Sequence, residues 1–89
     1  MIEIQSRQNA ALKHLARLGR ERKYRRSTGE MLCEGEKNAG RRLRSGAKLK
    51  TVLVKDGWDS PFIKEAEEQG ATLYSAPDAL FKLASEVET

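Results

Sequence analysis

The amino-acid sequence predicts an α/β fold, a three-layer α/β/α sandwich with a small, mainly parallel sheet, preceded by a basic N-terminal helix. Short runs typical of strands alternate with helical stretches, which gives one helix followed by three strand–helix pairs. The predicted strands begin about 20 residues apart, a spacing that suits right-handed crossovers between parallel neighbours. A chain of 89 residues has room for one such domain with a modest core.

The first predicted element is helical and covers residues 6–26. Asn9 is suited to begin it, because its side chain can accept a hydrogen bond from the first helical turn. Three leucines then recur at helical spacing and are expected to face inward: Leu12, Leu15 and Leu18. Gly19 is expected to end this helix in a left-handed turn. A short basic helix is expected over residues 20–26, so that residues 1–28 form a basic helical N-terminal segment.

The sandwich itself is expected over residues 29–84. Its strands are predicted at 30–34, 51–54 and 72–74, and its helices at 36–45, at 61–70 and from Pro77 onward. Residues 51–54 (Thr-Val-Leu-Val) form a β-branched run typical of a strand that is covered on both faces. Ser60 and Pro61 are typical of a helix start, the first as a cap and the second at the first helical position.

Charge is distributed unevenly along the chain. Residues 1–50 contain 14 Lys/Arg and 5 Asp/Glu, a net charge of +9, whereas residues 51–89 contain 3 and 8, a net charge of −5. Such asymmetry favours a protein with one side facing a polyanion, and nucleic acid is the first candidate; scattered solvated charge is the alternative. No apolar run approaches the roughly 20 residues of a membrane span, and we expect no membrane partner. Residues 1–7 do not resemble a signal peptide and a lone cysteine forms no internal disulfide, so we expect a cytoplasmic protein.

Residue patterns typical of catalysis or metal binding are missing from the sequence. It has no glycine-rich phosphate loop and no CxxC pair, and His14 has no Cys or His at ligand spacing, so we expect neither a metal nor a catalytic residue in this chain. His14 is expected to be solvated, and Cys33 to be a core side chain of a strand. Glu36 is interpreted as an acidic residue that favours a helix N-terminus. Trp58 is expected to fold back over the edge of the core.

Basic residues gather in two places. One group lies within 14 residues and includes one aromatic side chain, Tyr24: Lys13, Arg17, Arg20, Arg22, Lys23, Arg25 and Arg26. The other lies on the helix expected after the first strand: Lys37, Arg41, Arg42 and Arg44. Guanidinium and ammonium groups suit phosphate oxygens, and a helix start offers free N–H groups to an anion. We expect the two groups to form one continuous positive face that binds nucleic acid.

Several short segments, in this order and spacing, resemble the substrate-binding domain of the SpoU (TrmH-like) family of RNA 2′-O-ribose methyltransferases: residues 6–9, 25–26, 31–35 and 53–54, together with Lys13, Leu15, Leu18 and Gly29. Ala10 stands where the family usually has proline, and Lys37 offers the charge of the arginine that usually follows the Glu-Gly pair. The resemblance covers nearly the whole chain. It implies a fold similar to that of kink-turn-binding ribosomal proteins.

The resemblance also implies a function. This chain would bind rRNA or tRNA, while a C-terminal domain that it lacks would bind S-adenosylmethionine, catalyse methyl transfer and mediate any homodimer; residues 85–89 would begin the linker to that domain. The predicted RNA-binding residues are Asn9, Lys13, Arg17, Arg22, Lys23, Arg25, Arg26, Glu34, Gly35, Lys37 and Arg41. Two alternatives stay open: a free-standing RNA-binding protein of the kink-turn type without enzymatic role, and a protein-interaction module whose acidic second half docks a basic partner.

Overall fold

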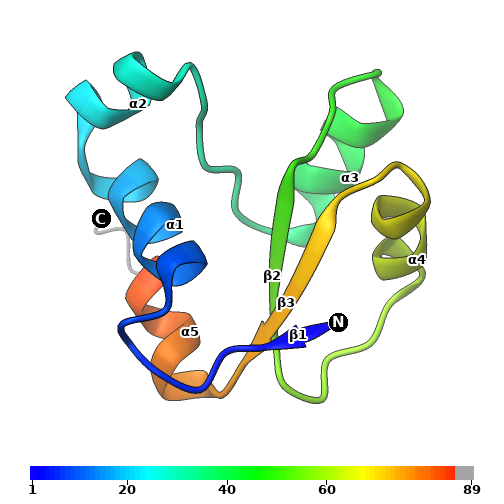
Figure 1. Cartoon of the computed structure of the whole chain (residues 1–89). Helices are drawn as coiled ribbons and strands as arrows, with labels where there is room; N and C mark the ends of the chain where they lie inside the picture. The colour runs from blue at the N-terminus through cyan, green and yellow to red at the C-terminus, as the bar shows by residue number, and fades with distance from the viewer. Residues whose placement is uncertain (86–89) are drawn as a thin grey trace.

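The structure, a computed structural model, describes residues 1–85 and contains one parallel sheet with helices on both faces (Figure 1). Its strands, in the spatial order β1-β3-β2, are β1 (Ile2–Glu3), β2 (Thr51–Lys55) and β3 (Thr72–Ala76). Its helices are α1 (Ala10–Arg20), α2 (Arg22–Thr28), α3 (Glu36–Arg44), α4 (Pro61–Glu68) and α5 (Asp78–Ser85). The predicted α/β class is confirmed. No helix within residues 1–85 has the length and apolar character that crossing a bilayer requires.

Two hydrophobic clusters attach the helices to the sheet. On one face, α1 and α5 pack around Ile4, Leu12 and Ala76. On the other face, α3 and α4 pack around Leu43, Phe62, Ala66 and Leu73. Neighbouring residues of β3 point to opposite faces, as strand geometry requires, so Leu73 joins the second cluster while Tyr74 packs against the first. The basic helices α1 and α3 therefore cover opposite faces of the sheet (Figure 1).

The prediction of a strand at residues 30–34 is wrong. This segment, between α2 and α3, forms neither helix nor strand. Leu32 packs against the cluster of α1 and α5, but Met31 is 61% exposed. The sheet instead gains β1, which pairs in parallel with β3 and was not predicted. Ile4 anchors β1, because its side chain is buried and its N–H donates to the carbonyl of Ser75 at 2.8 Å.

The helix ends in the structure confirm two predicted N-terminal caps and differ from the prediction at one glycine. The Asn9 side chain accepts a hydrogen bond from the N–H of Leu12 at 3.0 Å, and Ser60 caps α4 in a similar way. Gly19 does not end α1, which continues to Arg20 before the chain becomes extended at Glu21. A β-carbon at Gly19 would lie 3.0 Å from Cδ2 of Leu32, so this glycine allows close packing rather than a turn. Gly29, with φ of 72°, makes the left-handed end, at α2.

The predicted N-terminal segment is part of the sandwich itself. Residues 1–28 contribute both β1 and the three buried leucines of α1, so they belong to the same folded unit as the rest of the sandwich. Of the linker predicted at residues 85–89, only Ser85, the last residue of α5, lies within the described part of the chain.

Candidate nucleic-acid interface

The cations of α1 and α2 form the denser of the two basic groups. α2 buries none of its residues and packs beside α1, so its side chains face solvent on most sides. Apart from Arg20, which donates to the carbonyl of Leu83, four exposed cations of these two helices have no ion-pair partner within residues 1–85: Lys13, Arg22, Lys23 and Arg26. These four are free to contact phosphate groups.

Two predicted members of this group are already engaged within the protein. The Arg17 guanidinium lies 3.8 Å from the centre of the Tyr24 ring and pairs with the Glu21 carboxylate at 3.0 Å. The hydrogen bond that Arg17 donates to Glu21 raises the pKa of Arg17 above its ordinary value. Arg25 is half-buried and donates from Nη1 to the carbonyl of Leu18 at 2.7 Å. It therefore holds α2 against the end of α1 in addition to carrying charge.

The second basic group begins with the turn before α3. Gly35 adopts φ of 92°, which only glycine reaches without strain, and the helix starts at Glu36. Glu36 lies in the first helical turn, as interpreted from the sequence, and its carboxylate also accepts a hydrogen bond from the Ser60 hydroxyl. This N-terminus therefore already faces one negative charge, which makes Lys37 and Arg41, both exposed, the better contacts for an anion.

The structure divides the predicted RNA-binding residues between two layers. Those of α1 and α2 lie together over one face of the sheet: Asn9, Lys13, Arg17, Arg22, Lys23, Arg25 and Arg26. Those on the other side lead into or belong to α3: Glu34, Gly35, Lys37 and Arg41. The segment 29–35 connects the two layers (Figure 1). One continuous positive face across both layers stays a prediction.

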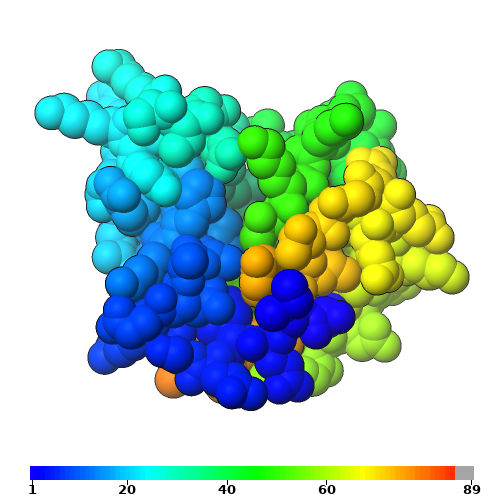
Figure 2. Space-filling model, in the orientation of Figure 1, coloured from blue at the N-terminus to red at the C-terminus, as the bar shows by residue number. Residues whose placement is uncertain are grey.

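A cleft of about 920 Å³ separates the segment 29–35 from β2. The molecular surface is hollowed between the region of α2 and the chain that leaves α3 (Figure 2). All five residues of β2, including Lys55, line the cleft, and so do three further cations: Arg42, Lys48 and Lys50. Trp58 also lines it and is 38% exposed, so it does not fold away over the core edge as expected. Cys33 lies in the loop, not in a core strand as predicted, and is only half-buried.

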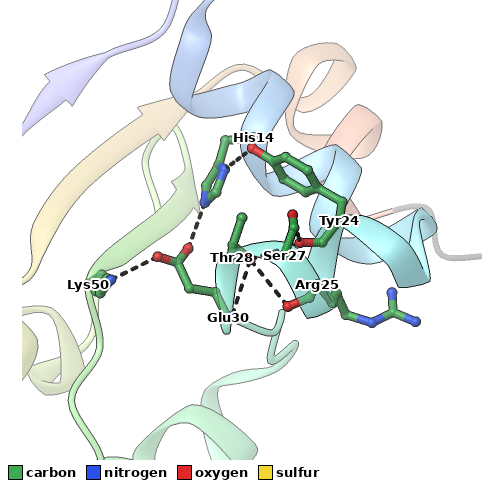
Figure 3. Close-up of polar contacts among 7 residues, drawn as sticks. All are labelled: His14, Tyr24, Arg25, Ser27, Thr28, Glu30 and Lys50. Carbon is green, nitrogen blue, oxygen red and sulfur yellow. Dashed lines mark hydrogen bonds and ion pairs between the residues drawn. The ribbon is translucent and has the colours of Figure 1, made fainter.

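A chain of polar contacts crosses from α1 to the start of β2 (Figure 3). The Nδ1 atom of His14 lies 2.7 Å from the Tyr24 hydroxyl, and its Nε2 atom lies 2.8 Å from Oε1 of Glu30. The Lys50 ammonium donates to Oε2 of the same carboxylate at 2.8 Å. The prediction that His14 is merely solvated is wrong, since its side chain is 31% exposed and bonded at both ring nitrogens.

The charges of this chain of contacts are mutually consistent. The hydrogen bonds from Lys50 and, second, from His14 lower the pKa of Glu30 below its ordinary value, so the carboxylate is ionised and can only accept. In a neutral imidazole, Nε2 must then carry the proton donated to Glu30, and Nδ1 accepts from the hydroxyl of Tyr24. Sequence reasoning missed this network because its members are far apart in the chain. His14 and Tyr24 are 10 residues apart, His14 and Glu30 are 16 apart, and Glu30 and Lys50 are 20 apart.

These features define a class of protein: a small α/β domain with exposed cations on its helices, of the kind that binds a polyanion. Within residues 1–85, no group of three or more His, Cys, Asp or Glu side chains could hold a metal ion. The sequence matches the MRM3-like substrate binding domain over residues 9–89, and the chain belongs to this family. The match confirms the resemblance to the substrate-binding domains of SpoU (TrmH-like) RNA methyltransferases.

Comparison with curated proteins and with solved structures gives no match. The more specific likeness to kink-turn-binding ribosomal proteins therefore stays a prediction.

Proposed function

We propose that this domain binds a structured rRNA or tRNA and holds one ribose in the active site of an S-adenosylmethionine-dependent 2′-O-methyltransferase domain. The observation that carries the proposal is membership of the substrate-binding family over residues 9–89. The exposed cations of α1 and α2 support it, because phosphate contacts supply most of the affinity of such complexes and fix the position of the nucleic acid.

The division of labour follows from how binding energy is used. Contacts made far from the reacting hydroxyl can position that hydroxyl, and correct positioning removes much of the entropic part of the barrier. In this proposal the domain contributes binding only. S-Adenosylmethionine, the catalytic groups and any homodimer contact belong to a separate C-terminal domain, and the protein acts in the cytoplasm.

The test is a salt titration of RNA binding by fluorescence anisotropy, with labelled rRNA and tRNA fragments. With six phosphate contacts to a duplex region, affinity should fall about a thousandfold between about 50 and 200 mM salt. Arg22→Ala, Lys23→Ala and Arg26→Ala should each weaken binding to all RNAs and reduce the salt slope by about 1.

Lys64→Ala is the matched control. Lys64 is exposed on α4, which covers the face of the sheet opposite α1, and the variant changes the net charge by the same amount. It should leave both affinity and slope close to those of the wild type. If the three α2 variants behave like Lys64→Ala, α2 is not part of the interface. RNA binding that does not respond to salt would contradict the proposal as a whole.

A further inference from the structure

Glu30 lies between two donors that come from distant parts of the fold. His14 on α1 approaches one carboxylate oxygen and Lys50, just before β2, approaches the other, each at 2.8 Å. Two donors on two oxygens of one anionic group is also the arrangement in which a phosphodiester accepts hydrogen bonds through its two non-bridging oxygens. The carboxylate of Glu30 therefore has the charge and the acceptor geometry of a bound phosphate group.

The His14 ring and the backbone of Lys50 are held by contacts that do not involve Glu30. His14 is held from its other side by the hydroxyl of Tyr24 at 2.7 Å, and the ring of Tyr24 is in turn covered by the Arg17 guanidinium at 3.8 Å. Lys50 directly precedes β2, which is paired with β3 along its full length. Removing the carboxylate would thus leave the His14 ring held by Tyr24 and an unpaired ammonium on Lys50 that can reach the same point.

Glu30 itself is held weakly. It belongs to the segment 29–35, which has no regular secondary structure, and its backbone N–H is bonded only to the Thr28 hydroxyl at 3.2 Å. The side chains of the ion pair are 26% exposed for Glu30 and 72% exposed for Lys50. An exposed ion pair of this kind contributes little net stability, so another anion can replace the carboxylate.

The position of the three residues points to RNA as the anion. His14 follows Lys13 directly and lies one turn before Arg17 on α1, and so belongs to the basic helix layer. Lys50 lines the cleft together with Arg42 and Lys48. A phosphate held between His14 and Lys50 would connect the cations of α1 and α2 with those around the cleft.

We propose that His14 and Lys50 form a phosphate-binding subsite that Glu30 occupies in the free protein and that a backbone phosphate of the RNA takes over in the complex. The inference rests on the proposed function. It assigns a binding role to two side chains that the sequence did not select, and it makes Glu30 an internal competitor of the substrate.

The decisive variant is Glu30→Gln, which keeps the size of the side chain and an acceptor for His14 but removes the charge that holds Lys50. RNA affinity should rise about three- to tenfold, because binding no longer has to displace a carboxylate from Lys50, whereas the salt slope should stay close to that of the wild type, since the same phosphate is contacted in both complexes. In the Glu30→Gln background, Lys50→Ala should abolish the gain. Glu67→Gln, an equal charge change on α4, should produce none.

The outcomes separate this inference from the proposed function. If the wild type binds no RNA, the proposed function fails. If the wild type binds with the expected salt slope, the inference is overturned by any of three results: no gain in Glu30→Gln, a gain that survives Lys50→Ala, or an equal gain in Glu67→Gln. Far-ultraviolet circular dichroism of each variant shows whether the fold is kept.

A second measurement needs no variant. His14 is the only histidine of the chain, so its imidazole signals in a proton NMR spectrum are unambiguous. They should shift when RNA is added to the wild type, and inorganic phosphate at millimolar concentration should shift them in Glu30→Gln but much less in the wild type. Histidine signals that do not move on RNA binding would overturn the subsite. A shift with phosphate alone and not with RNA would assign the site to free phosphate and would likewise overturn it.

Discussion

Arg25 and Arg26 are neighbours with the same predicted role, and the structure separates them. Arg26 is exposed and has no ion-pair partner within residues 1–85, whereas Nη1 of Arg25 donates to the carbonyl of Leu18 at 2.7 Å. That carbonyl is in the last turn of α1, where carbonyl groups have no intrahelical partner, and a guanidinium there also interacts favourably with the helix dipole. Arg25→Ala should therefore destabilise the fold, and Arg26→Ala should not.

The expected magnitude follows from the lost hydrogen bond. Leaving a half-buried acceptor without its partner costs about 1–3 kcal/mol, and we expect the lower end because water can reach part of the site. For a domain of this size about 1 kcal/mol lowers Tm by roughly 4–8 °C. A surface substitution without such a contact usually changes stability by less than about 0.5 kcal/mol, so Arg26→Ala should shift Tm by no more than about 2–4 °C.

Thermal unfolding followed by circular dichroism, combined with RNA binding by anisotropy, tests this contrast. Both variants should bind RNA more weakly at a temperature where both are folded, but only Arg25→Ala should melt early. Equal melting temperatures for the two variants would refute the structural role of Arg25, whatever their RNA affinities.

Three further predictions concern the core, the acid limb of stability and catalysis. Leu12→Ala, at a side chain only 1% exposed, should cost about 2–5 kcal/mol in a urea titration, while a comparable loss for Leu80→Ala, at a half-buried position, would contradict the assigned core. The pKa of Glu30 is lowered in the folded state, chiefly by Lys50. The ionised carboxylate therefore stabilises the fold above about pH 4.3, the ordinary pKa of a glutamate, and this contribution is lost as the pH falls through the folded pKa. Glu30→Gln should flatten the acid limb of the curve of stability against pH. Incubated with labelled S-adenosylmethionine and RNA, residues 1–89 alone should transfer no methyl group; label in the RNA would contradict the assignment of catalysis to another domain.

The parts of the fold that could be predicted depend on local signals. The β-branched run of β2 identifies a buried strand from its own composition, and Asn9 and Ser60 mark helix starts through hydrogen bonds within a few residues. The short strand β1 has no such signal. Two residues show no periodicity, and what fixes them is the burial of Ile4 and the pairing with β3, about 70 residues further along the chain.

Segment 30–34 shows why a short apolar run is not sufficient for a strand. Leu32 packs against the core, whereas Met31 is exposed and Cys33, which was expected in the core, is only half-buried. A strand also needs a partner, and in this structure β1 occupies the free side of β3, while the segment is separated from β2 by the cleft. Its contacts are made by side chains instead, with Glu30 bound to His14 and Leu32 packed close to Gly19.

The change of direction at Glu21 explains why composition could indicate the basic helices but not the role of each side chain. This residue is extended, with φ of −108° and ψ of 107°, so α2 leaves the axis of α1 after a single non-helical residue. With the chain turned at this point, Tyr24 lies against Arg17 and His14, and Arg25 reaches Leu18. In one uninterrupted helix, 3.6 residues per turn and a rise of about 1.5 Å per residue would place Tyr24 about 15 Å along the axis from His14. The break therefore both creates the network around His14 and divides the arginines into those that hold the fold and those that remain free for RNA.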